Sequence, residues 1–92
     1  MMNNPAYKLT TALTFETVVA VRENLFQHIL SHHNNAIYLD LSGVKHCDSA
    51  GLALLIDVKK FCQKHDRQLM LTGVSKETQS LAEFCGIHDL LI

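Results

Sequence analysis

Apolar residues recur with two different spacings along the chain, and these spacings predict strands that alternate with helices. In residues 37–41 every second residue is apolar, as in a β-strand with one buried face. Residues 68–72 repeat this alternation, and residues 7–13 form a less regular strand-like run. In residues 15–32 and 49–65 the apolar positions instead recur every three or four residues, which is typical of amphipathic helices.

This order of elements predicts the fold class. A strand, a helix and a second strand in sequence favour parallel strands joined by a right-handed crossover. A third helix after Ser75 and a last extended segment at residues 90–92 complete the pattern. We therefore predict an α/β fold, a small sandwich with a mixed sheet of about four strands and helices mostly on one face.

Polar residues at the expected helix ends support these boundaries. Thr14, Asp48 and Ser75 each stand where a side-chain oxygen can accept a hydrogen bond from the first turn of a helix. With Asp48 as the cap, Ser49 becomes the first residue of the second helix, beside the positive end of the helix dipole. Gly86 suits the left-handed position that ends the third helix.

The first helix has one broad apolar arc that contains a single charged residue. Arg22 lies within this arc, where its aliphatic stem can pack while the guanidinium reaches water, or where it can face a partner. The apolar members of the arc are Phe15, Val18, Val19, Val21, Leu25, Phe26, Ile29 and Leu30.

The second helix has two apolar faces rather than one. Its core stripe consists of Leu54, Leu55, Val58, Phe61 and Cys62. On another side, Leu52, Ala53 and Ile56 form a small apolar patch with Ser49 at its rim and Lys60 further along. This patch has the composition of a docking surface for a protein partner. The alternative is that a neighbouring helix covers Leu52 and Ile56.

Composition narrows the class of protein. With 92 residues, 48% hydrophobic and 18% charged, the chain fits a single domain over residues 7–92 after a flexible start at residues 1–6. A net charge of -1 argues against a nucleic-acid partner. The sequence contains neither a run long enough to span a membrane nor the pattern of a signal peptide, so we expect a cytoplasmic protein that does not insert into the membrane.

Candidate catalytic and metal-binding residues do not form convincing sites. His46, Asp48 and Ser49 suggest a hydrolase, but Cys47 stands where the nucleophile-elbow motif requires its first glycine. His28 and His32 are one helical turn apart, yet no carboxylate or cysteine nearby completes a metal site. We therefore predict no catalytic residue, no metal and no cofactor.

The segment 48–55, Asp-Ser-Ala-Gly-Leu-Ala-Leu-Leu, preceded by the strand at 37–41, resembles the core of STAS domains. This family includes the C-terminal regions of sulfate transporters and the bacterial anti-anti-sigma factors. Residues 13–18 and 51–55, with the short end after Gly86, look most like the MlaB group of STAS proteins. These are small cytoplasmic subunits of ABC transporters that move phospholipid and maintain outer-membrane lipid asymmetry.

This resemblance implies a non-catalytic protein that binds the ATPase subunit of an ABC transporter, with its permease in the full complex at the inner membrane. The helix that begins at Ser49 would supply the contact surface, with Leu52, Ala53, Ile56 and Lys60 as partner-binding residues. The alternative is an anti-anti-sigma factor in a partner-switching cascade. Ser49 matches the position at which such factors are phosphorylated, which makes it a possible regulatory site.

Overall fold

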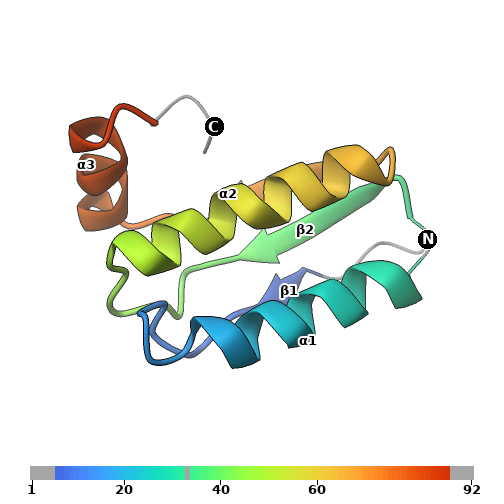
Figure 1. Cartoon of the computed structure of the whole chain (residues 1–92), viewed down its shortest axis with the longest axis horizontal. Coiled ribbons are helices and arrows are strands. Elements are labelled where there is room, and N and C mark those ends of the chain that lie inside the picture. Colours follow the sequence, from blue (N-terminus) through green and yellow to red (C-terminus); the bar gives the residue numbers. More distant parts are fainter. Residues whose placement is uncertain (1–5, 33, 88–92) are drawn as a thin grey trace.

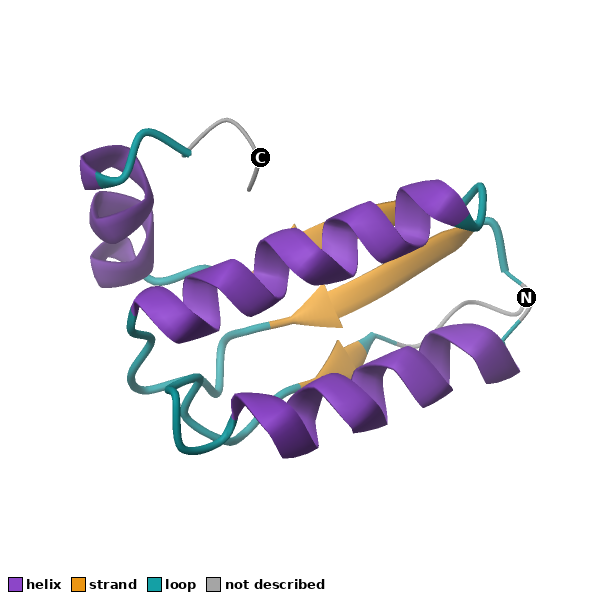
Figure 2. Ribbon diagram, in the orientation of Figure 1, coloured by secondary structure: helices purple, strands orange, loops and turns teal. Residues whose placement is uncertain are grey.

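The computed structural model describes residues 6–32 and 34–87 and confirms the predicted alternation of strands and helices. The elements follow the chain as β1 (Tyr7–Lys8), α1 (Val18–Ser31), β2 (Ala36–Asp40), α2 (Ser49–Lys64), β3 (Gln68–Thr72) and α3 (Lys76–Phe84). The molecule has two main layers, because α1 and α2 lie side by side over one face of the sheet (Figures 1 and 2). The third helix, α3, lies across the end where α2 begins (Figure 1).

The described sheet has three strands in the order β1-β2-β3, and both pairings are parallel. Ile37 pairs with Leu69 and Leu39 with Leu71, so the apolar positions of β2 and β3 share the face under the helices. Where the sequence predicts a mixed sheet of about four strands, the described part is thus smaller and entirely parallel. The predicted last strand, residues 90–92, lies outside the described residues.

The core forms between the sheet and the helices. Leu39 of β2, Ile29 of α1 and Val58 of α2 are fully inaccessible to water. The stripe predicted for α2 is confirmed, since Leu54, Leu55, Val58 and Cys62 are buried and Phe61 is half-buried. Burial of this apolar surface is the main favourable contribution to folding.

The first helix is shorter and packs with a narrower stripe than the sequence predicts. It begins at Val18 rather than at Phe15, and Thr17, not Thr14, is its N-cap residue. Its buried residues are Val21, Leu25 and Ile29. Phe15, Val19 and Leu30 of the predicted apolar arc are exposed, because the sheet and α2 cover only one side of the helix.

The other predicted helix ends are confirmed. The Asp48 carboxylate accepts a hydrogen bond from the Gly51 N–H, and the Ser75 hydroxyl accepts one from the Thr78 N–H. Gly86 adopts a φ of 75°, and the Ile87 N–H donates to the Ala82 carbonyl, as in a helix that ends in a left-handed residue.

The loop before α1 is tied directly to the start of α2. Leu13 forms a parallel bridge with Cys47, in which the Leu13 N–H donates to the His46 carbonyl at 2.8 Å and the Asp48 N–H donates to the Leu13 carbonyl at 3.0 Å. Gly51 passes so close to this loop that a Cβ there would overlap the Leu13 carbonyl oxygen and lie 2.7 Å from the Leu13 Cβ. Only glycine fits at this position.

At the opposite end of α1, an aromatic cluster joins the helix to β1. The His28 ring lies between Tyr7 and His32, with ring centroids 4.6 and 4.1 Å away. Partial burial, and secondarily the charge of His32, lower the pKa of His28. Arg67 closes this end of α1 by donating hydrogen bonds to the carbonyls of Ile29 and His32.

Gly51→Ala should destabilise the domain by about 1–3 kcal/mol or more, because the new methyl group must push the Leu13 backbone away from α2. Chemical denaturation measures this change in the free energy of unfolding. Ser49→Ala, in the same helical turn but at an exposed position, is the matched control and should stay within about 0.5 kcal/mol of the wild type. Equal stability of the two variants would show that Gly51 does not approach Leu13 as closely as described.

Stability should fall as the pH is lowered below the ordinary pKa of histidine, about 6.5. The pKa of His28 is lower in the folded chain than in the unfolded chain, so the unfolded chain binds this proton first. The contribution of neutral His28 to the free energy of unfolding is therefore complete above pH 6.5. It is lost as the pH falls through the pKa of His28 in the folded chain. Urea denaturation at pH 7.5 and at lower pH measures this fall in unfolding free energy. The fall should be smaller for His28→Gln than for the wild type, and an equal fall would show that His28 is not its source.

Candidate functional site

The N-terminus of α2 and the turn before α1 form one surface, and Asp48 joins them. Ser49 is the first residue of α2 and its side chain is exposed. Beside it, the two carboxylate oxygens of Asp48 accept hydrogen bonds from different segments. Oδ1 accepts from the Gly51 N–H at 3.0 Å, which caps α2, and Oδ2 accepts from the Phe15 N–H at 3.1 Å.

These hydrogen bonds keep Asp48 ionised. The Gly51 N–H is the main reason that the pKa of Asp48 lies below its ordinary value. Partial desolvation acts in the opposite direction, and the Phe15 N–H adds to the lowering. The surface around Ser49 therefore carries a fixed negative charge at neutral pH, although it lies at the positive end of the helix dipole.

The turn of residues 14–17 presents a large aromatic side chain to water. The Thr14 carbonyl accepts hydrogen bonds from the N–H groups of Thr17 and Val18, at 2.9 and 3.0 Å. Between these residues, Phe15 is 73% exposed, and Val19 in the next turn is 69% exposed. Such a pair of exposed apolar side chains, set on hydrogen-bonded backbone, is a feature of interaction surfaces.

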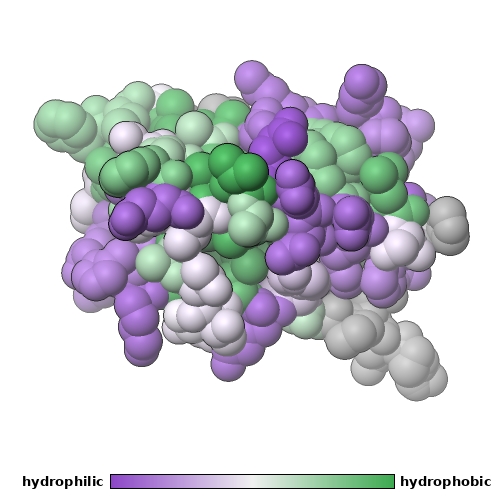
Figure 3. All heavy atoms as spheres, turned by 60° about the horizontal axis from the view of Figure 1, so that its bottom comes forward, coloured by the Kyte–Doolittle hydropathy of each residue, from purple (hydrophilic) through white to green (hydrophobic). Residues whose placement is uncertain are grey.

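A groove of about 310 Å³ runs between α1 and α2 beside this turn. It exists because α2 presents only the small side chains of Ala50 and Ala53 opposite the valines of α1. Its lining residues are Val18, Val19, Arg22, Ala50, Ala53, Leu54 and Asp57. Figure 3 brings the α1 side of the molecule forward and shows hydrophobic atoms gathered between areas of hydrophilic ones.

An ion pair closes the groove toward the C-terminal end of α1. The Arg22 Nε donates to Asp57 Oδ2 at 3.1 Å, and the guanidinium lies 4.4 Å from the centre of the Phe26 ring. Phe26 in turn stacks on Phe61 at 4.1 Å. The charged end of Arg22 is thus half exposed, as expected for a side chain that reaches water, and it is paired with α2, whereas the alternative that it faces a partner stays a prediction.

Only part of the predicted docking patch is accessible to a partner. Ser49, Ala53 and Lys60 are exposed and Ile56 is half-buried, so these four are accessible. Leu52 is only 1% exposed and belongs to the core, which corrects its assignment to the patch. A neighbouring helix, α3, does pack against α2, at the end where α2 begins (Figure 1).

The accessible surface extends in a direction that the sequence did not indicate. Phe15 and Val19 fit a helical apolar arc, so their spacing predicts burial. Only the position of Phe15 in a turn before the helix, and the width of the face that α1 buries, place both side chains in water. Together with Ser49 and Ala53 they form what we call the α1–α2 surface, defined as Phe15, Val19, Ser49 and Ala53.

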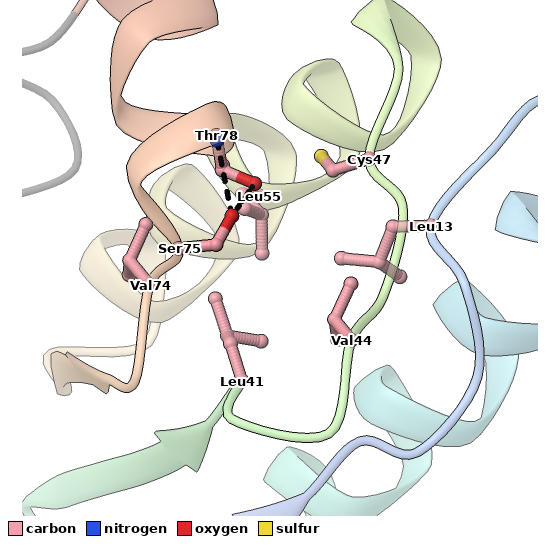
Figure 4. A pocket seen from close by; sticks show the side chains of 8 residues that line it. All are labelled: Leu13, Leu41, Val44, Cys47, Leu55, Val74, Ser75 and Thr78. Atoms are coloured by element: carbon pink, nitrogen blue, oxygen red, sulfur yellow. Dashed lines mark hydrogen bonds between the residues drawn. The ribbon is translucent and has the colours of Figure 1, made fainter.

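A second hollow lies at the carboxyl ends of the strands, but it is too small for a ligand. Figure 4 shows the side chains of Leu13, Leu41, Val44, Cys47, Leu55, Val74, Ser75 and Thr78 around it. Its volume of about 10 Å³ corresponds to about one water molecule. Burial raises the pKa of the Cys47 thiol, which favours the protonated, unreactive form at neutral pH.

Within residues 6–32 and 34–87, no group of three or more histidine, cysteine or acidic residues is arranged to hold a metal ion. Among the helices of this same part of the chain, none is long and apolar enough to cross a membrane.

Comparison with known proteins shows which family this chain resembles. A family model described as STAS domain matches residues 3–91. An anti-sigma-B factor antagonist from Staphylococcus aureus (strain NCTC 8325 / PS 47) is 36% identical over 55 residues, which make up 60% of this chain and 51% of that protein. An anti-sigma-B factor antagonist from Staphylococcus epidermidis is 31% identical over 55 residues, with the same shares covered. The chain thus aligns with about half the length of these relatives.

Leu52→Ala should cost about 2–5 kcal/mol of unfolding free energy, because it leaves a cavity in the core. Ala53→Ser, at the adjacent exposed position, should change stability by less than about 0.5 kcal/mol. Thermal and chemical denaturation of both variants test the division of the predicted patch. A Leu52→Ala variant as stable as Ala53→Ser would show that Leu52 is not part of the core.

Proposed function

This chain belongs to the STAS domain family, and from that membership we propose that it is a non-catalytic regulator that acts by binding a protein, in the manner of an anti-sigma factor antagonist. Its partner would be an anti-sigma factor, which the bound chain keeps from its sigma factor. The relatives named as anti-sigma-B factor antagonists support this reading.

The observation that carries the proposal is the position of Ser49 on the α1–α2 surface. Its hydroxyl is exposed at the first residue of α2, on the same surface as two exposed apolar side chains, Phe15 and Val19. A partner that covers this surface must also cover Ser49. A modification of one hydroxyl can therefore control the whole contact.

Phosphorylation of Ser49 would weaken the contact for a physical reason. A phosphate adds about two negative charges at neutral pH. The helix dipole favours those charges, but the ionised Asp48 next to them opposes them, and their desolvation under a partner is costly. The unmodified chain is thus the binding form, and the phosphorylated chain is the released form.

A second candidate function is a subunit of an ABC-type phospholipid transport system that maintains outer-membrane lipid asymmetry. The residues that favour it are 13–18 and 51–55, which resemble the MlaB group. In that case the same surface, with Ile56 and Lys60 at its edge, would bind the ATPase subunit, whose permease completes the complex. The chain would then be cytoplasmic and peripheral to the inner membrane.

Affinity capture with the whole chain as bait, in the organism that encodes it, tests the proposal. We expect an anti-sigma factor to be recovered with the wild type and lost with Ala53→Asp, because the new carboxylate enters the desolvated contact. Ser80→Asp, on the exposed side of α3, is the matched control and should retain the partner.

The other outcomes are equally specific. Recovery of an ABC ATPase with its permease, lost in Ala53→Asp, would replace the first function with the second. Retention of either partner by Ala53→Asp would show that the α1–α2 surface is not the contact. Ser49→Glu should reduce recovery less than full phosphorylation does, because it carries about half the charge of a phosphate.

A further inference from the structure

We propose that Phe15 is the anchor that enters an apolar pocket of the protein partner, and that Asp48 positions it so that the state of Ser49 controls its presentation. This inference rests on the proposed function and extends it to a specific side chain and to a route of regulation. It comes from the contrast between the exposure of the Phe15 ring and the number of hydrogen bonds that hold its backbone.

The turn around Phe15 is held from both sides. The Thr17 hydroxyl accepts a hydrogen bond from the Thr14 N–H at 3.0 Å and donates one to the Ala12 carbonyl at 2.6 Å. On the other side, the Phe15 N–H donates to Asp48. The backbone at Phe15 is therefore fixed before any partner binds, although its ring is 73% exposed.

Such an arrangement suits an anchor residue. A phenyl ring has only two side-chain torsions, and ordered backbone reduces the entropy that is lost on binding. Aromatic residues that enter a pocket commonly contribute a large share of the binding energy at an interface. The groove beside Phe15 can in turn receive an apolar side chain of the partner, between Val18 and Ala53.

The charges around the ring favour a protein over a membrane as the occupant. Glu16 follows Phe15 and is exposed, and Asp48 lies beneath the turn. Asp57 lines the groove, where Arg22 neutralises it. Anionic lipid headgroups would be repelled by the first two carboxylates, whereas an apolar pocket in a folded partner can take the ring alone.

Asp48 can transmit the state of Ser49 because both of its carboxylate oxygens are already in use. One holds the first turn of α2 and the other holds the Phe15 N–H. A phosphate on Ser49 would compete for the N–H groups of that first turn and repel the carboxylate. The carboxylate would then turn away, and the hydrogen bond to Phe15 would be lost.

The first experiment needs no partner. Exchange of backbone amide protons with water is measured by NMR in the unmodified chain and in the chain carrying phosphoserine at position 49. We expect exchange at Phe15 to become about tenfold faster, as loss of one charge-assisted hydrogen bond implies. The Leu13 amide, which donates to His46, should not change and serves as the internal reference.

The Asp48→Asn variant tests whether Asp48 couples Ser49 to Phe15 while a helix-capping side chain is kept. Asparagine caps helices as well as aspartate does, so its one side-chain oxygen should stay at the Gly51 N–H, and its NH2 group, which only donates, then faces the Phe15 N–H. We expect fast exchange at Phe15 in this variant whether or not Ser49 is phosphorylated. An unchanged Phe15 amide on phosphorylation of the wild type would overturn the coupling.

The second experiment tests the anchor with two exposed phenylalanines. Phe15→Ala should weaken binding of the purified partner from the capture experiment by about tenfold or more. Phe84→Ala removes a ring that is 90% exposed on α3 and should bind as the wild type does. Wild-type affinity in Phe15→Ala, or binding of the chain to phosphatidylglycerol vesicles through Phe15, would overturn the anchor.

The capture, NMR and binding experiments distinguish failure of the Phe15 anchor from failure of the proposed function. If Ala53→Asp abolishes binding while Phe15→Ala does not, the proposed function stands and the anchor fails. If no anti-sigma factor or transporter ATPase is captured, the proposed function fails, and the NMR arm still decides whether Asp48 couples Ser49 to Phe15.

Discussion

The close approach of Gly51 to Leu13 brings the two segments of the candidate site together. It allows the Leu13 carbonyl to accept from the Asp48 N–H, and so fixes the loop before α1 against the start of α2. Any side chain at position 51 would separate these segments. The Asp-Ser-Ala-Gly sequence thus has a structural meaning: the aspartate caps the helix, and the glycine admits the neighbouring loop.

The same contact creates the candidate site. Because the two segments are held together, the Asp48 carboxylate reaches the backbone of Phe15 as well as that of Gly51. The exposed ring, the exposed Ser49 and the alanines of α2 then form one continuous surface beside a groove. A binding surface of this kind acts by shape, apolar area and charge.

Local sequence patterns predict the alternation of strands and helices and one half of the site, but not the entirely parallel sheet of the described residues or the start of α1 at Val18. Alternation in residues 37–41 and 68–72 predicts the parallel pair of β2 and β3, and Asp48 is recognisable as a cap from its neighbours alone. Periodicity gives only the direction in which a helical side chain points, not what lies there. Periodicity therefore misplaces Leu52, which lies in the core, and misses Phe15, whose exposure depends on a turn that ends before α1 begins.

NMR titration of the ¹⁵N-labelled chain with its purified protein partner would show which residues the partner contacts. We expect the largest shift changes in residues 14–19 and in the first two turns of α2, which carry the proposed contact surface. Changes centred instead on Tyr38 and Met70, which pair across β2 and β3 and are both exposed, would place the partner on the sheet and contradict this account.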